Sequence, residues 1–107
     1  MMDKQPTPGK KMADDSFVEL RRDAILRIAR SHGAMDVRLF GSYAKGEEKP
    51  ESDLDLLVTL EPHRSLLDLI AIKQDLEDEL EIEVDVVTEA SLSPYFRDQV
   101  IKETILL

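Results

Sequence analysis

The feature that most constrains the fold is a Gly-Ser pair that separates two strand-like segments. Residues 37–40 form a short strand pattern that runs directly into Gly41 and Ser42. Residues 45–52 are polar and contain glycine and proline, a composition typical of a loop. Residues 53–59 then alternate between polar and apolar side chains, as a strand with one buried face does. The sequence therefore predicts strand, tight turn, loop and strand at the centre of the chain.

Patterns typical of helices and of a further strand flank this centre. Ser16 opens an S-x-x-E capping box, which predicts a helix that ends near Gly33. A second helix is predicted over residues 65–81, a third strand over residues 82–88 and a last helix over residues 93–107. This mixture of helices and strands indicates an α/β or α+β fold.

The spacing of the apolar residues also predicts which faces are buried. In the strand after the loop, one face is apolar and consists of Leu54, Leu56 and Val58. The other face begins with the acids Asp53 and Asp55. In the second helix, helical spacing predicts a buried stripe. Its members are Leu66, Leu69, Ile70, Leu76 and Leu80.

The length of 107 residues is that of one domain. Residues 1–15 are polar and contain prolines, a glycine and lysines, so we expect a disordered N-terminal tail. Residues 16–107 carry the helical and strand patterns, and we expect them to form a single domain.

The composition narrows the partners and the location of the chain. The formal net charge is −9 and the sequence pI is about 4.6. An acidic protein gains nothing from counterion release at phosphates, which disfavours direct nucleic-acid binding. The chain has no cysteine, no apolar segment typical of a signal peptide and no run long enough to span a membrane. We therefore expect a cytoplasmic protein with no membrane partner.

Three acids form a predicted metal site. Asp53 and Asp55 share one face of their strand, and their Cα atoms are roughly 6.5–7 Å apart. Mg²⁺ is usually held by one or two carboxylates together with phosphate oxygens of a substrate. In the third strand, Asp85 likewise lies on the face opposite its apolar neighbours. If the two strands are neighbours, the acids converge, and their mutual repulsion favours a bound cation.

The turn at Gly41 and Ser42 is suited to bind phosphate. Glycine allows a tight turn and a close approach of phosphate to the backbone. The Ser42 hydroxyl and the backbone N–H groups that follow it can donate to phosphate oxygens. On a helical turn, Lys45 would add a positive charge on the same side.

These residues resemble the signature of the minimal nucleotidyltransferases, a family within the DNA polymerase beta-like superfamily. That signature is a Gly-Ser pair, a loop, an Asp-x-Asp or Asp-x-Glu pair and a later third acid. Here ten residues separate Ser42 from Asp53, and Asp85 is the later acid. The resemblance covers residues 16–107. It implies a nucleotidyltransferase fold, with a small mixed sheet of three or more strands and helices packed on one face.

The resemblance also implies roles for these residues. The catalytic acids and Mg²⁺ ligands would be Asp53, Asp55 and Asp85, with two ions in the site. The triphosphate of ATP would be bound by Gly41 and Ser42. Many members of the family have arginine where this chain has Lys45, which keeps the charge but loses the bidentate geometry.

Members of this family often act as antitoxins of HEPN-domain ribonuclease toxins, by transferring AMP from ATP to a tyrosine hydroxyl of the toxin. The resemblance therefore implies an Mg²⁺-dependent protein adenylyltransferase with such a toxin as its partner. Larger relatives carry extra domains that bind their acceptors. We expect a chain of this size to meet its acceptor in a homodimer, in a hetero-oligomer or on the acceptor protein itself.

Two other functions stay open from the sequence. One is a steric antitoxin whose catalysis is not essential. The other is a nucleotidyltransferase that acts on a small molecule or a nucleic acid with the help of another subunit. The complete set of three acids favours an enzyme, because a purely steric inhibitor has no need of metal ligands.

Overall fold

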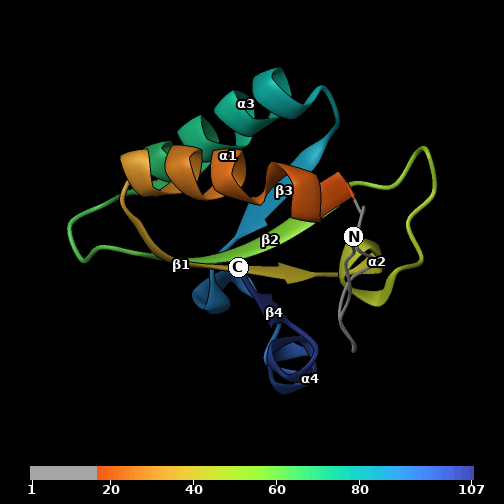
Figure 1. Ribbon diagram of the computed structural model, residues 1–107. Coiled ribbons are helices and arrows are strands. Elements are labelled where there is room, and N and C mark those ends of the chain that lie inside the picture. Colours follow the sequence, from red (N-terminus) through yellow and green to blue (C-terminus); the bar gives the residue numbers. More distant parts are fainter. Residues whose placement is uncertain (1–16) are drawn as a thin grey trace, which may run out of the picture.

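Helices and strands alternate along the chain in the predicted order as far as the third strand (Figure 1). The computed structural model describes residues 17–107, so the predicted tail and the predicted cap at Ser16 lie outside the described residues. The elements are α1 (Phe17–Ser31), β1 (Ala34–Phe40), α2 (Ser42–Lys45), β2 (Leu54–Leu60), α3 (Leu66–Leu80), β3 (Val84–Val87), the 3₁₀ helix η1 (Glu89–Ser91), α4 (Arg97–Lys102) and β4 (Ile105–Leu106).

The strands form one mixed sheet in the order β3-β2-β1-β4. β1 pairs antiparallel with both β2 and β4, whereas β2 pairs parallel with β3. A short helix and a loop suffice to join β1 to β2, but the parallel pair needs the longer crossover through α3. The predicted mixed sheet of three or more strands is confirmed.

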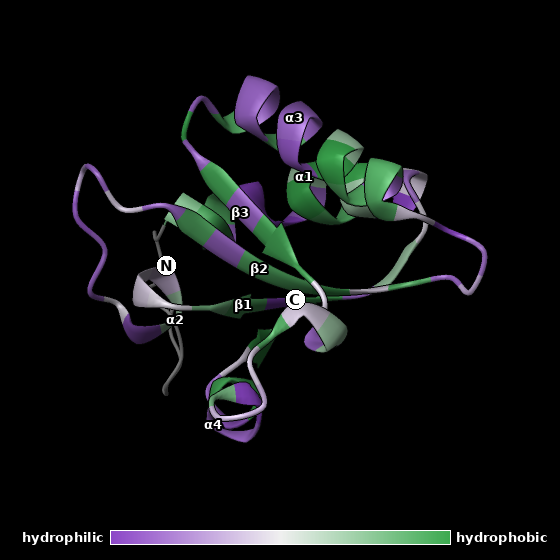
Figure 2. Cartoon of the chain, turned by 180° about the vertical axis from the view of Figure 1, so that it is seen from behind, coloured by the Kyte–Doolittle hydropathy of each residue, from purple (hydrophilic) through white to green (hydrophobic). Residues whose placement is uncertain are grey.

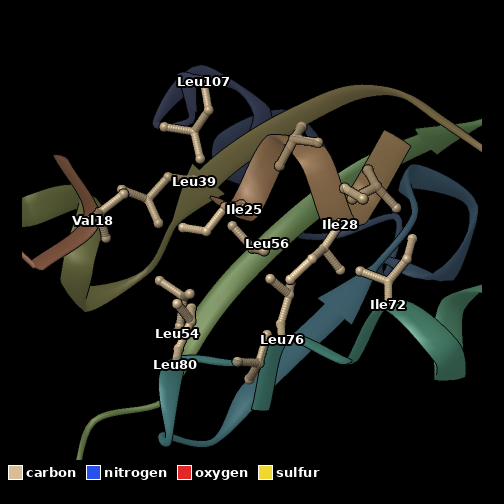
Figure 3. Packing of buried hydrophobic residues seen from close by; sticks show 14 of the residues in the cluster. Val18, Ile25, Ile28, Leu39, Leu54, Leu56, Ile72, Leu76, Leu80 and Leu107 are labelled. Atoms are coloured by element: carbon tan, nitrogen blue, oxygen red, sulfur yellow. The ribbon is translucent and has the colours of Figure 1, made fainter. Parts of the chain in front are cut away.

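The core lies between the sheet and two helices. α1 and α3 pack together on one face of the sheet, as predicted, and η1 and α4 lie on its other side (Figure 1, Figure 2). Apolar side chains from both helices meet the inward side chains of the strands (Figure 3). The largest fully buried side chains are Val18, Ile25, Leu39, Leu54, Leu56, Val58, Ile72, Leu76 and Val84.

α1 and α3 are the two long helices, with 15 residues each. Ser65 caps α3 where the sequence predicts its start. Its hydroxyl accepts a hydrogen bond from the Leu67 N–H at 3.2 Å, and Asp68 Oδ2 accepts one from the Ser65 N–H at 3.0 Å. Of the helices within residues 17–107, none is both long and apolar enough to cross a membrane.

The buried stripe of α3 differs from the prediction. Leu76 and Leu80 are buried as expected, but Leu66 is 68% exposed and Ile70 is 41% exposed. Ile72, which the predicted stripe leaves out, is fully buried. At roughly 100° per residue, Ile70 points about 160° away from Ile72. A stripe that contains Ile72 and Leu76 therefore cannot include Ile70.

The predicted last helix over residues 93–107 is wrong in its final part. The hydroxyl of Ser93 does cap a turn, but α4 begins only after it and ends before the last residues. Ile105 and Leu106 instead form β4 and pair with β1. A strand suits this segment because it buries Leu107 in the core while Leu106 faces outward.

Leu76→Ala is expected to lower the free energy of unfolding by about 2–5 kcal/mol, because it leaves a cavity in the core. Leu66→Ala is the matched control in the same helix. It removes an exposed side chain and should change the free energy by less than about 0.5 kcal/mol. Urea unfolding followed by circular dichroism measures the stability of both variants. Equal losses of stability would contradict the finding that α3 buries Leu76 and exposes Leu66.

Candidate active site

The turn after β1 is built on Gly41. Its φ of 78° and ψ of −153° are easily adopted only by glycine. Its carbonyl accepts hydrogen bonds from the N–H groups of Ala44 and Lys45, at 3.1 and 3.2 Å, which closes the single turn of α2. The N–H groups of Ser42 and Tyr43 precede these bonds, so they have no partner within the turn.

Gly41 also lies directly against Asp55. β1 and β2 pair so that Phe40 is the partner of Asp55 in the ladder. A Cβ atom at residue 41 would overlap Oδ2 of Asp55 and lie 3.1 Å from its Cγ. The turn and the carboxylate are therefore adjacent in space, although a loop separates them in the sequence.

Asp55 and Asp85 lie opposite each other in the sheet. They are register partners on the parallel strands β2 and β3, and such neighbouring strands are about 4.8 Å apart. Hydrophilic segments lie side by side in these two strands (Figure 2). Asp53 lies one residue before β2 and is exposed, as is Asp85. The adjacency of the two strands, on which the predicted convergence of the acids depends, is confirmed.

The pKa of Asp55 reflects its burial and the acids near it. Burial, then the charge of Asp85, then the charge of Asp53 raise the pKa of Asp55 to about 6. A divalent cation would relieve this repulsion. Within residues 17–107, no three acids are gathered closely enough to form a finished metal site. The pair that the sheet does bring together, Asp55 and Asp85, offers carboxylate oxygens, which suit Mg²⁺ because this ion takes one or two carboxylates and completes its shell with water and substrate phosphates.

Lys45 is less favourably placed to bind phosphate than Gly41 and Ser42 are. Its Nζ lies 3.8 Å from Oε1 of Glu103, just after α4, and both side chains are about half exposed. Such an exposed pair contributes little stability. A phosphate would compete with Glu103 for this charge, so the expected phosphate contact of Lys45 stays a prediction.

An aromatic contact that the sequence does not reveal fixes the turn. The ring of Tyr43 packs against Phe17 with the centroids 5.9 Å apart, and the guanidinium of Arg21 lies 3.8 Å from the Phe17 ring centre. Burial, followed by the charge of Glu48, raises the pKa of Tyr43, so its hydroxyl stays neutral. Two aromatic residues so far apart in the sequence give no periodic signal.

A cavity of about 280 Å³ borders the acids. Residues 50–53 and 81–83 line it, so Asp53 and Glu83 add negative charge to its walls. This lining suits a cation or a basic side chain better than a triphosphate. The Gly-Ser turn, on the other side of Asp55, is the part of the site that suits phosphate.

The fold and the site together define a nucleotidyltransferase. A small mixed sheet carries a Gly-Ser turn after β1 and acids on adjacent strands, and the chemistry of these groups suits phosphate and a cation. Residues 22–107 match the family described as the nucleotidyltransferase domain. The chain belongs to this family, whose members act on a nucleotide substrate.

Relatives and solved structures agree with this assignment. The chain is 38% identical to the protein adenylyltransferase MntA of Thermococcus cleftensis over 73 residues, which are 68% of this chain and 74% of that protein. It is 48% identical to a candidate minimal nucleotidyltransferase of known structure, with a TM-score of 0.77 over 84% of this chain and 92% of the other. A chain of a toxin–antitoxin crystal structure with AMP-PNP is 26% identical, with a TM-score of 0.68 over 78% and 69% of the two chains.

Gly41→Ala is expected to weaken Mn²⁺ binding by about tenfold or more, because the new methyl group displaces the Asp55 carboxylate. Gly46→Ala is the matched control. Gly46 also has a positive φ, 70°, but nothing lies within 4 Å of an added Cβ. It should lose roughly 1–2 kcal/mol of stability and keep its metal affinity. Electron paramagnetic resonance measures Mn²⁺ affinity, and equal weakening in both variants would contradict the role of the contact.

Asp55→Asn is expected to raise the free energy of unfolding at neutral pH by about 1 kcal/mol in EDTA, since it removes a charge that is disfavoured by burial and then by the charges of Asp85 and Asp53. Because the pKa of Asp55 is raised in the folded state, its contribution to stability is full below pH 3.8 and is lost as the pH rises through about 6. The variant should therefore lose less stability than the wild-type chain between about pH 4.5 and pH 7.5.

Urea unfolding at the two pH values measures this difference. Asp78→Asn, at an exposed acid of α3, is the matched control and should leave the pH dependence as in the wild type. A wild-type chain whose stability falls no more than that of Asp55→Asn would contradict the raised pKa of Asp55.

Proposed function

We propose that this chain transfers AMP from ATP to a tyrosine hydroxyl of a partner HEPN ribonuclease toxin and thereby acts as its antitoxin. The observation that carries this proposal is the close approach of Gly41 to Asp55, which sets a phosphate-binding turn directly beside the acids. The relative MntA is named a protein adenylyltransferase, and one structural neighbour is part of a toxin–antitoxin complex with AMP-PNP. These two similarities favour a protein acceptor.

The triphosphate of ATP would lie against α2. The Ser42 hydroxyl and the N–H groups of Ser42 and Tyr43 are the donors available to its oxygens. Gly41 has no side chain to hold the phosphates away from the backbone. This turn would bind the β- and γ-phosphates, which leave together as pyrophosphate.

The three acids would hold Mg²⁺, as one or two ions. When bound, Mg²⁺ neutralises charge on the phosphates and on the leaving group. Asp55 is half-buried at the start of β2, and its position is fixed by the sheet and by Gly41. Asp53 and Asp85 are exposed on either side, where an acceptor can approach.

The transfer itself exchanges one bond to phosphorus for another. The hydroxyl oxygen of the acceptor forms a bond to the α-phosphorus of ATP, and the bond from that phosphorus to pyrophosphate breaks. The hydroxyl proton would pass to a carboxylate, a role that we assign to Asp85 because it lies opposite Asp55 in the sheet and is exposed. AMP remains on the acceptor.

The charge of the chain favours a basic protein surface as the partner. A net charge of −9 attracts such a surface and disfavours RNA or DNA as the acceptor. We expect a hetero-oligomer with the toxin in the cytoplasm, where ATP is available. A homodimer of this chain is the alternative assembly.

The proposal is tested by incubating the chain with a HEPN-domain ribonuclease from the same organism, Mg²⁺ and ATP labelled at the α-phosphate. A label should appear on a tyrosine of the partner, and the ribonuclease activity of the partner should fall. Asp53→Ala/Asp55→Ala should leave the partner unlabelled and active. Asp78→Ala/Glu79→Ala, which removes two exposed acids of α3, should behave like the wild type.

The alternatives give different results in the same experiment. If neutralisation persists while labelling is lost, the chain is a steric antitoxin and the enzymatic account of neutralisation fails. If RNA or a small hydroxylated compound is labelled but no protein is, the proposed acceptor is wrong.

A further inference from the structure

The strand that carries Asp85 lies at an edge of the sheet. In the order β3-β2-β1-β4, no strand of the described residues lies beyond β3. Val84, the residue before Asp85, is the register partner of Leu54 on the inner side. Successive residues of a strand direct their backbone groups to opposite sides, so an edge strand presents unpaired N–H and C=O groups. Unless other groups bind these N–H and C=O groups, the strand that carries Asp85 is hydrogen-bonded on one side only.

Two side chains of α3 bind this edge. Glu77 Oε2 accepts a hydrogen bond from the Val84 N–H at 3.0 Å, and Lys73 Nζ donates one to the Val84 carbonyl at 2.8 Å. Lys73 and Glu77 also pair with each other at 2.7 Å, one helical turn apart. The helix thus supplies a donor and an acceptor to one residue, as a neighbouring strand would.

These contacts differ from an ordinary surface ion pair. Most exposed pairs contribute little stability. Here the pair satisfies backbone groups of Val84, whose side chain is almost fully buried, and leaving such groups unpaired is costly. The hydrogen bond to Glu77 raises the pKa of Lys73, and the charges of Asp85 and Glu83 act in the same direction. Lys73 is therefore a cation close to Asp85.

We propose that Lys73 and Glu77 are positioning residues that hold Val84 so that Asp85 stays opposite Asp55. The inference rests on the proposed role of Asp85 as a metal ligand. Groups that orient a metal ligand commonly change metal affinity by about 10–100-fold when they are removed. The pair acts through the backbone of β3 and contacts neither metal nor nucleotide.

Charge and positioning predict opposite effects of Lys73→Met. If only charge mattered, removal of a cation near Asp85 would strengthen the binding of Mn²⁺. If Lys73 holds the Val84 carbonyl in place, its removal lets β3 shift and weakens Mn²⁺ binding. The direction of the change therefore separates the two explanations.

The test measures Mn²⁺ affinity by electron paramagnetic resonance and hydrogen exchange of the Val84 amide by NMR in the metal-free chain. Glu77→Ala and Lys73→Met should each weaken Mn²⁺ binding by about tenfold. Glu77→Ala should also speed exchange at Val84 by about tenfold or more. Glu77→Gln, which retains an oxygen acceptor for the Val84 N–H, should recover most of both losses.

Two controls make the result specific. Glu79→Ala removes an exposed acid from the same helix and should change neither measurement. In an Asp85→Asn background, Glu77→Ala should weaken Mn²⁺ binding by less than about twofold, because both changes act through the same ligand.

Unchanged Mn²⁺ affinity in Glu77→Ala, tighter binding in Lys73→Met or equal weakening with and without Asp85 would overturn the inference. If Asp85→Asn loses Mn²⁺ affinity while Glu77→Ala keeps it, the proposed metal site stands and the positioning role fails. If all Mn²⁺ results are as expected but no AMP reaches the partner, the positioning role stands and the proposed acceptor fails.

Discussion

The parallel pairing of β2 with β3 is the constraint on which the site depends. Its register places Asp55 opposite Asp85, and a slip by one residue would exchange Asp85 for a valine. The register is set by the core, since Leu54 and its partner Val84 are both buried on the side of the helices. The same apolar alternation that folds the domain therefore brings Asp55 and Asp85 side by side on the other face.

The acids are brought together at some expense of stability. Asp55 is half-buried, and its pKa is raised first by that burial and then by the charges of Asp85 and Asp53. Gly41 adds a second constraint, because the Asp55 carboxylate occupies the space that any side chain at residue 41 would fill. A bound cation would relieve the repulsion among these carboxylates, and without one the surrounding core has to support it.

Local patterns in the sequence predict much of this arrangement. The Gly-Ser turn, the alternation of β2 and the start of the second helix near Ser65 depend on neighbouring residues, and all three are found in the structure. The phase of α3 is not predicted correctly, because Leu66 and Ile70 are as apolar as Ile72 and only the packing on α1 and the sheet decides between them.

Contacts between distant segments are beyond such patterns. The last residues pair with β1, and this pairing buries Leu107 in the core. No local sequence pattern predicts that Ile105 belongs to a strand. Lys73 and Glu77 have the spacing of an ordinary solvated helical pair, and only the packing of β3 shows that they bind Val84. The approach of Gly41 to Asp55 is likewise visible only once β1 and β2 are paired.

The most direct test of the account is a crystal structure of the chain with Mn²⁺ and AMP-PNP, with the metal located by its anomalous scattering. The account predicts metal bound by the carboxylates of Asp53, Asp55 and Asp85, with the triphosphate against Ser42 and the backbone of α2. Metal bound away from Asp55, or a triphosphate bound away from the Gly-Ser turn, would contradict it.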